Sequence, residues 1–415
     1  MNTPALLCLS AACLALAASA AEPNAPTAVN RDLLAKARKI LRGVPLVDGH
    51  NDLPWQFHKH GDDLGFFDLR VNGRGLAGWP VTDIPRLREG EVGAQFWSVY
   101  VPAELSGPAA VQEVLKQIDF VHRMVAAYPD TFELAGTADD IERIHRHGRI
   151  ASLIGMEGGH SIGGSLATLR MMYDLGARYM TLTHTKTTEW ADSANDKPLH
   201  HGLTPFGEDV VREMNRIGML VDISHVSDDT MRAALKISQA PVIFSHSSAR
   251  ALCDNPRDVP DDVLRLLPQN GGVVMVCFVP GFTIARESVD MTAHDKLEDE
   301  LEAKYGENSK EAREQLAAWR QAHPAPEPGT LADVANHIDH IREVAGIDHI
   351  GIGSDFDGFH GSLLGLEDVS TYPALFAELL RRGYSKEDVR KIAGENVIRA
   401  LRQTEKVSAS LRGAK

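Results

Sequence analysis

The stretch Val44-Pro-Leu-Val-Asp-Gly-His-Asn-Asp52 joins a short apolar run to a histidine and an aspartate at its end. A run of this length and composition is typical of a buried strand, and a polar side chain at its carboxyl end is typical of a site. Five further runs repeat the pattern, and each ends in a residue that can bind a metal or move a proton. They are Ile150–Glu157, Tyr179–His184, Met219–His225, Pro241–His246 and His349–Asp355.

Two more runs, Ala94–Val101 and Gly272–Phe278, have the strand pattern without such a terminal residue. The total is eight, with helix-like segments between most of them. Eight strand-then-helix units predict an α/β fold, the (β/α)8 TIM barrel, whose active site lies at the carboxyl ends of the strands. The side chains that can bind a metal or move a proton therefore lie where the active site of that fold is found.

Helix-like segments separate most of the predicted strands. They are Arg31–Leu41, Ala110–Ala127, Ser165–Leu175, Gly207–Ile217, Asp228–Ile237, Pro260–Leu267, Leu331–Val344, Tyr372–Arg382 and Ser385–Arg402. The segment 294–323, between the seventh and eighth strands, is highly charged and is closed by a proline-rich stretch, which indicates a solvated helical insertion rather than a second domain. We therefore expect residues 21–415 to form one catalytic barrel domain.

The net charge and the two ends of the sequence limit the classes of protein to which this chain can belong. The formal net charge of −14 argues against nucleic-acid binding and against a polybasic membrane anchor. Residues 1–20 contain an uncharged apolar run followed by a small-residue cleavage pattern, which predicts a signal peptide cut after Ala20 and export to the periplasm or the medium. The polar C-terminus offers no tail for a lipid anchor.

Five of the strand-end residues form a candidate metal centre. His50 and Asp52 are two positions apart at a strand tip, so their side chains point the same way, while His225 and His246 end neighbouring strands. The carboxylate of Glu157 has two oxygens and can bridge two cations. Imidazole with carboxylate suits zinc, and two adjacent metals can share a hydroxide in a hydrolytic reaction.

Several segments resemble the membrane (renal) dipeptidase family of zinc peptidases. The matching segments run in order from about residue 44 to residue 401, so they cover most of the chain after residue 20. They are Val47-Asp-Gly-His-Asn-Asp-Leu-Pro-Trp55, Gly155-Met-Glu-Gly-Gly159, Leu182-Thr-His184 with Trp190-Ala-Asp192, Asp222-Ile-Ser-His225, Phe244-Ser-His-Ser-Ser248, Gly353-Ser-Asp-Phe-Asp-Gly358 and Gly394-Glu-Asn-Val-Ile-Arg-Ala-Leu401. The family fold is a (β/α)8 barrel with a binuclear zinc site, which agrees with the strand count.

The resemblance implies a role for each site residue. His50 and Asp52 match the ligands of one zinc ion, His225 and His246 match those of the second, and Glu157 matches the bridge. The resemblance therefore implies two zinc ions per chain.

Three further residues match positions that handle the substrate. His184 matches a histidine that contacts the substrate near the scissile carbonyl and steadies the oxyanion. Arg257 matches the arginine that holds the substrate's C-terminal carboxylate, a task suited to a planar guanidinium. Asp355 matches the acid/base that passes a proton from the attacking water to the leaving amine.

The expected function is a zinc-dependent dipeptidase that hydrolyses free dipeptides through a metal-bound hydroxide. One alternative is another binuclear-metal amidohydrolase that acts on lactones, phosphotriesters or cyclic amides. Those enzymes commonly carry His-x-His on the first strand and a carboxylated lysine bridge, where this chain has Asp52 and Glu157. A second alternative is a catalytically silent binding protein on the same barrel. The choice of dipeptide, homodimer formation and the pairing of Cys253 with Cys277 stay open.

Overall fold

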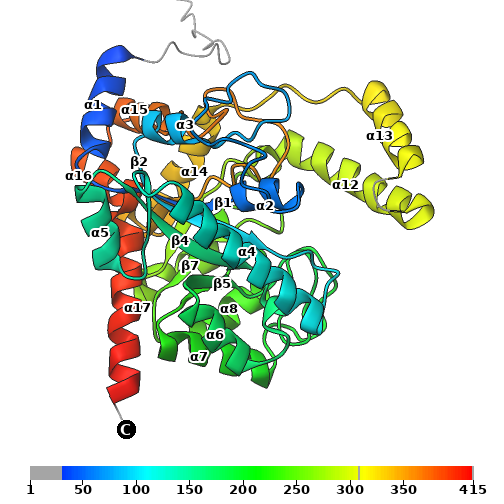
Figure 1. Cartoon of the computed structure of the whole chain (residues 1–415), viewed down its shortest axis with the longest axis horizontal. Helices are drawn as coiled ribbons and strands as arrows, with labels where there is room; N and C mark the ends of the chain where they lie inside the picture. Colours follow the sequence, from blue (N-terminus) through cyan, green and yellow to red (C-terminus); the bar gives the residue numbers. More distant parts are fainter. Residues whose placement is uncertain (1–29, 307–308, 414–415) are drawn as a thin grey trace, which may run out of the picture.

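The computed structural model describes residues 30–306 and 309–413, and its centre is a closed barrel of parallel strands (Figure 1). Neighbouring strands follow the order β2-β1-β9-β8-β7-β6-β5-β4, and the pairing of β4 with β2 closes the ring. This arrangement confirms the predicted (β/α)8 fold. The strands are β1 (Leu46–Asn51), β2 (Val92–Tyr100), β4 (Ile150–Glu157), β5 (Ala177–Thr181), β6 (Leu220–Asp222), β7 (Val242–Ser247), β8 (Val273–Val276) and β9 (Ile350–Ile352).

The sheet has one further strand, and some barrel strands end earlier than the apolar runs predict. The additional strand, β3 (Phe132–Leu134), pairs only with the first three residues of β4 and lies outside the barrel. Strand β5 ends at Thr181 and β6 at Asp222, so His184 and His225 lie in the loops just beyond their strands. The apolar character of each run continues into the loop because the loop residues are also buried.

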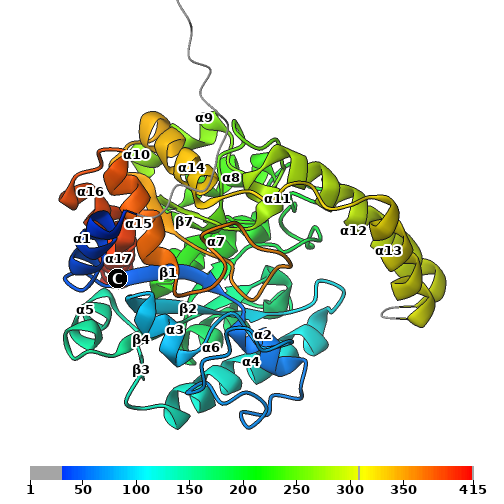
Figure 2. The ribbon, with the colours of Figure 1, turned by 90° about the horizontal axis from the view of Figure 1, so that it is seen from above.

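Helices surround the barrel on its outer side (Figures 1 and 2). Those before β7 are α1 (Arg31–Leu41), α2 (Leu53–His58), α3 (Ile84–Glu89), α4 (Gly107–Ala127), α5 (Ala138–Arg146), α6 (Leu166–Asp174), α7 (Pro205–Ile217) and α8 (Asp228–Ile237). Those after β7 are α9 (Asp261–Leu264), α10 (Leu267–Asn270), α11 (Pro280–Thr283), α12 (Ala285–Tyr305), α13 (Lys310–Ala322), α14 (Leu331–Val344), α15 (Tyr372–Arg381), α16 (Lys386–Arg390) and α17 (Asn396–Gly413).

The sequence patterns located the long helices and missed the short ones. The bounds of α1, α8 and α14 agree with the predicted segments, whereas α2, α3, α5 and α11 were not predicted. The expected helix Pro260–Leu267 is instead the two four-residue helices α9 and α10. The expected helix Ser385–Arg402 is α16, a π-helical turn at Lys391–Glu395, and α17, which continues to Gly413.

The predicted charged insertion is the pair of helices α12 and α13. It starts at Ala285, ahead of the predicted boundary at residue 294, and it follows β8, the seventh barrel strand. In both views the two helices project from the body of the barrel (Figures 1 and 2). Arg320 of α13 forms an ion pair with Asp290 of α12, with 2.9 Å between Nη1 and Oδ1, and this contact joins the two helices.

The C-terminal helix closes the amino-terminal end of the barrel. Inward-facing strand residues form one buried cluster, and Val397, Ile398 and Leu401 of α17 belong to it. The guanidinium of Arg399 donates to the carbonyl of Gly271, just before β8, and to that of Asp348, in the short 3-10 turn before β9. The amino end is therefore filled, and the carboxyl ends of the strands are left for a site.

Two other sequence predictions concern the chain ends and the cysteines. The predicted signal peptide, residues 1–20, lies outside the described residues. Within residues 30–306 and 309–413, none of the helices is both long and apolar enough to cross a membrane. Cys253 and Cys277 are buried free thiols.

Candidate metal centre and active site

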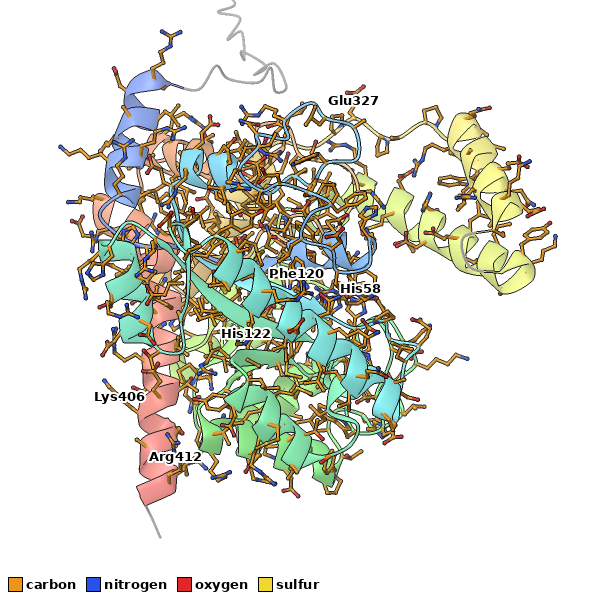
Figure 3. The ribbon with its side chains drawn as sticks, viewed as in Figure 1. His58, Phe120, His122, Glu327, Lys406 and Arg412 are labelled. Carbon is orange, nitrogen blue, oxygen red and sulfur yellow. The ribbon has the colours of Figure 1, made fainter. Side chains whose placement is uncertain are left out.

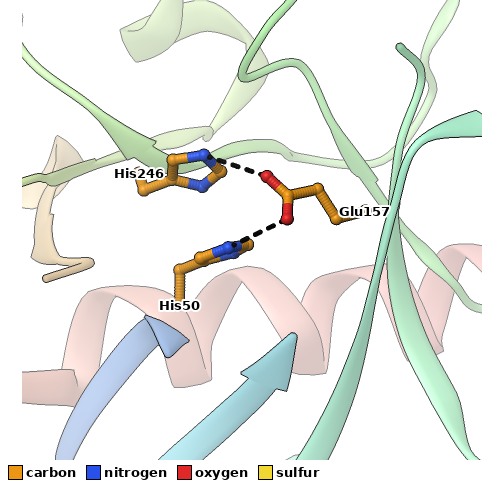
Figure 4. A group of neighbouring side chains, drawn as sticks. All are labelled: His50, Glu157 and His246. Carbon is orange, nitrogen blue, oxygen red and sulfur yellow. Dashed lines mark ion pairs between the residues drawn. The ribbon is translucent and has the colours of Figure 1, made fainter. Parts of the chain in front are cut away.

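A compact group of imidazoles and carboxylates lies at the carboxyl ends of the barrel strands. Glu157, the last residue of β4, directs its Oε2 atom to His50 Nε2 of β1 at 3.4 Å. Its Oε1 atom lies 3.6 Å from His246 Nε2 of β7 (Figure 4) and 3.1 Å from His225 Nε2. The two oxygens of one carboxylate therefore face different imidazoles.

Each side of Glu157 holds a second close pair. On one side, His50 Nε2 lies 3.3 Å from Asp52 Oδ2. On the other, the Nε2 atoms of His225 and His246 are 2.8 Å apart. All five side chains are buried. Ring nitrogens and carboxylate oxygens that converge in this way form the donor set of a metal centre.

The protonation of the group is consistent with a cation at its centre. Burial lowers the pKa of His225 and His246 well below the usual histidine value, so both rings are neutral and can act as ligands. Burial raises the pKa of Glu157, but His50 and His225 outweigh it and hold that pKa well below its usual range. Burial also lowers the pKa of His50, but its interactions with Tyr179, Glu157 and Asp52 more than reverse this and hold that pKa well above its usual value. Glu157 therefore keeps its negative charge within the cluster.

Hydroxyl groups fix the orientation of two of the rings. The Tyr179 hydroxyl lies 2.8 Å from His50 Nδ1, and Ser245 Oγ lies 2.8 Å from His246 Nδ1. Ser245 in turn donates to Asp222 at 2.6 Å. Because Ser245 donates its own proton to Asp222, its Oγ accepts from His246 Nδ1, and a proton held there leaves Nε2 of His246 as the ligand nitrogen on the side of Glu157.

Sequence reasoning assigned no role to Tyr179, Ser245 or Asp222. The sequence signal for Asp222 was a carboxylate inside the apolar run Met219–His225, because a buried carboxylate in a strand requires hydrogen-bond donors. Tyr179 gave a weaker signal, since a tyrosine is ordinary in a strand.

His184 and Asp355 lie at the edge of the cluster. His184 Nε2 is 3.7 Å from Glu157 Oε1, and its side chain is 15% exposed. Asp355 Oδ1 is 3.9 Å from His50 Nε2, its side chain is 13% exposed, and burial raises its pKa well above the usual aspartate value. At these distances His184 and Asp355 can each act either as a metal ligand or as a group that contacts the substrate.

Two of the cluster residues have an uncommon backbone conformation. His225 has φ 64° and Asp355 has φ 66°, in the left-handed region that disfavours residues with a side chain. The Asp355 N–H donates to the His50 carbonyl at 3.1 Å, which ties this loop to β1. Such strain is typical of functional sites, where the surrounding structure holds a side chain in one direction.

Arg257 is a buried cation beside the cluster. Its side chain donates to the His246 carbonyl at 3.1 Å, and its guanidinium carbon lies 5.0 Å from the centre of the Phe282 ring. The residue is only 1% exposed, and among the described residues its Nε atom has no hydrogen-bond partner. Burial lowers the pKa of Arg257, while Cys277 and Asp355 act in the opposite direction. A buried guanidinium with unused donor capacity indicates a missing anionic partner.

A cavity of about 720 Å³ connects these groups to solvent. Glu157, His184, His225, Arg257 and Asp355 line it, with Asp52 and the aromatic side chains of Trp55 and Tyr100. His50 and His246 are buried at the same cluster without lining the cavity. The structure thus brings all eight sequence-predicted site residues to one place, while their individual roles stay predictions.

The barrel and this cluster together are typical of a metal-dependent hydrolase, and comparison with known proteins identifies the family. The family "Membrane dipeptidase (Peptidase family M19)" matches residues 34–415. The chain is 43% identical to mouse "Dipeptidase 3" over 382 residues, which is 90% of this chain and 67% of that protein. It is 42% identical over 380 residues to "Dipeptidase tcpJ" of Claviceps purpurea, covering 88% and 78% of the two chains.

A solved structure shares the fold. The "probable dipeptidase PvdM" of Pseudomonas aeruginosa superposes with a TM-score of 0.73 and 23% identity, over 91% of this chain and 99% of that chain. The protein therefore belongs to the membrane dipeptidase family, peptidase family M19, whose members are metallopeptidases. This membership supports a metal-dependent dipeptidase.

We predict that Tyr179→Phe weakens metal binding by roughly 10–100-fold, because His50 loses the hydroxyl that orients its ring. Competition with a chelator of known affinity measures this change. The matched control is Tyr384→Phe, which loses a hydrogen bond to Asp339 away from the cluster and should bind metal as the wild type does. Equal affinities in the two variants would contradict an orienting role for Tyr179.

Proposed function

We propose that this protein is a binuclear zinc dipeptidase that hydrolyses the peptide bond of free dipeptides. The observation that carries the proposal is the position of Glu157, whose two oxygens face two separate groups of ligand atoms. His50 and Asp52 would hold one zinc ion, and His225 and His246 the other, with Glu157 shared between them. Zinc bound there would lower the pKa of water and polarise the substrate carbonyl.

The family alone does not fix the metal or the number of ions, and the residues present fit two zinc ions. The donor set contains three imidazoles and two carboxylates, a combination that zinc accepts readily. His50 lies on the Oε2 side of Glu157 with Asp52 beside it, and His225 and His246 lie on the Oε1 side. Two groups of ligand atoms on opposite oxygens of one carboxylate favour two ions over one.

Arg257 would set the orientation of the dipeptide in the cavity by binding its C-terminal carboxylate. A free dipeptide ends in a carboxylate, and the buried guanidinium offers this group a charged hydrogen-bonding partner in the wall of the cavity. Substrate binding would then give this guanidinium a direct anionic hydrogen-bonding partner. This supports selection for a free C-terminus close to the scissile bond.

Asp355 would carry the proton transfer. Its carboxylate lines the cavity beside the cluster, and burial raises its pKa, so it can take a proton from the attacking water and deliver it to the leaving amine. His184 lines the same cavity, and burial lowers its pKa. A neutral imidazole there can donate one hydrogen bond to the carbonyl oxygen as negative charge develops on it.

We predict that the purified protein contains about two zinc ions per chain and that a chelator removes its dipeptidase activity. Glu157→Gln should lose metal and turnover together, because a neutral amide cannot balance two cations. Elemental analysis and dipeptide hydrolysis on the same samples measure both. Glu189→Gln, a change at an exposed residue outside this cavity, serves as the control. A zinc-loaded wild-type protein that cleaves no dipeptide would favour a silent binding protein.

Asp355→Asn should retain both metal ions and lose turnover by roughly 10²–10⁴-fold, the usual contribution of a positioned acid or base. Single-turnover rates and zinc content of the variant measure the two effects separately. The exposed change Asp209→Asn on α7 should alter neither. If Asp355→Asn instead loses zinc and regains its rate when zinc is added, Asp355 is a ligand.

Arg257→Ala should raise KM most for free-acid dipeptides and narrow their advantage over dipeptide amides. The expected loss is about 1.5–3 kcal/mol, the range for a hydrogen bond to a charged group. Arg257→Lys should recover only part of it, because an ammonium lacks the planar fork. Arg265→Ala, an exposed control, should leave the ratio unchanged. Equal hydrolysis of acids and amides by the wild type would contradict this role and strict dipeptide selection.

A further inference from the structure

One face of α12 forms a wall of the active-site cavity. Its cavity-lining residues are spaced three or four positions apart or adjacent, the pattern of a single helix face. They are Glu287, Asp290, Met291, His294, Asp295 and Glu298. Figures 1 and 2 show α12 extending outward from the barrel. The insertion is therefore part of the site and not only a peripheral projection.

The composition of this face is unusual for a helix that packs toward the protein. Such a face is normally apolar, but here Met291 is the one apolar side chain among six and four of the others are acidic. Both oxygens of Asp290 accept from Arg320 at 2.9 Å, so that charge is matched. Asp295 and Glu298 lie 3.6 and 3.8 Å from His294 Nδ1. The wall therefore carries net negative charge.

Specific contacts hold the first turns of α12 against the barrel. Arg286 donates to the carbonyls of Glu327 and Pro328, in the segment that returns from α13 and is marked by Glu327 in Figure 3. Ser288 Oγ accepts from Asn255 Nδ2 at 3.0 Å. The charged face is thus fixed in its direction at the end nearest the active site.

The same contacts place α12 next to Arg257. Asn255, which bonds to Ser288, also accepts from the Arg257 N–H at 2.9 Å. Phe282, just ahead of α12, lies against the Arg257 guanidinium. Within the described part of the chain, the Nε of this buried arginine has no hydrogen-bond partner, which is an independent sign of an anionic ligand in the cavity. In the proposed function, Arg257 holds the carboxylate of the C-terminal residue of the substrate. The acidic face of α12 therefore lies beside that residue.

We propose that the acidic face of α12 selects dipeptides whose C-terminal residue has a cationic side chain and disfavours those whose C-terminal residue is acidic. The inference rests on the proposed function, because it uses the substrate direction set by Arg257. Asp295 and Glu298 attract a lysine or arginine side chain that extends from the C-terminal residue toward the cavity mouth. The same charges repel a glutamate or aspartate there, and salt weakens both effects because these side chains are half exposed.

Hydrolysis of Gly-Lys, Gly-Leu and Gly-Glu by the zinc-loaded full chain tests the inference. The ratio of kcat/KM for Gly-Lys over Gly-Glu should exceed about five at low salt and fall as sodium chloride is added, with the difference mainly in KM. Asp295→Asn with Glu298→Gln should bring the ratio near one. Asp295→Lys with Glu298→Lys should reverse it, a gain for Gly-Glu that a merely misfolded variant would not show. Glu300→Gln, an exposed acidic residue of α12 that does not line the cavity, should keep the wild-type ratio.

The outcomes separate the two proposals. Similar kcat/KM values for the three dipeptides in the wild type would overturn the selection by α12 while leaving the dipeptidase function in place. A preference that follows lysine at the N-terminal position, seen as Lys-Gly over Gly-Lys, would overturn the assignment of the face to the C-terminal residue. No hydrolysis of any of the three by zinc-loaded protein would overturn the proposed function itself.

Discussion

The site depends on one carboxylate that is shared between two groups of imidazoles. Glu157 is the last residue of β4, and β4 pairs with β2 along its length, with β3 at its start and with β5 at its end. Ser98 of β2 donates to its Oε2 atom at 3.1 Å. Glu157 thus stands on the strand with the most pairing partners. Its position can change little without disturbing the barrel.

Two other buried carboxylates, those of Asp48 and Asp222, accept hydrogen bonds from neutral donors rather than from cations. Asp48 accepts from the hydroxyls of Tyr372 and Ser354 and from the Gln95 amide, and Asp222 accepts from Thr181 and Ser245. The Asp48 bonds join β1, β2, the loop after β9 and α15, and the Asp222 bonds join β5, β6 and β7. Hydroxyl and amide donors satisfy buried carboxylates without bringing a permanent positive charge to the cluster. Arg257 is a permanent cation beside the cluster, and a bound metal ion would add positive charge among the imidazoles and carboxylates.

Much of this arrangement followed from residue patterns, and the remainder depended on distance in three dimensions. The eight barrel strands were predicted because each is a buried apolar run, and β3 was missed because three residues give no periodicity. Short helices such as α2 and α3 escaped notice because their propensity is weak and their packing fixes them. Strand ends indicated His50, Glu157 and His246, since all parallel strands end at one face.

Contacts between distant parts of the chain could not be derived in the same way. Tyr179 reaches His50 from β5, 129 positions along the chain, and only the closed barrel brings them together. The start of α12 at Ala285 was also misplaced, because its first residues are less charged than the segment 294–323 that marked the insertion. The acidic face of α12 became visible only with the cavity, since in sequence it is one part of a generally charged helix.

The closure of the amino-terminal end by α17 has a consequence for how the chain acquires its structure. The interior cluster of the barrel is completed by Val397, Ile398 and Leu401, whereas the first strand of the ring begins at Leu46. Strand β1 also pairs with β9, so the ring joins early and late parts of the chain. During synthesis, the ring therefore stays open and its floor exposed until residue 401 has emerged. Contacts over such long sequence separations form late and slowly.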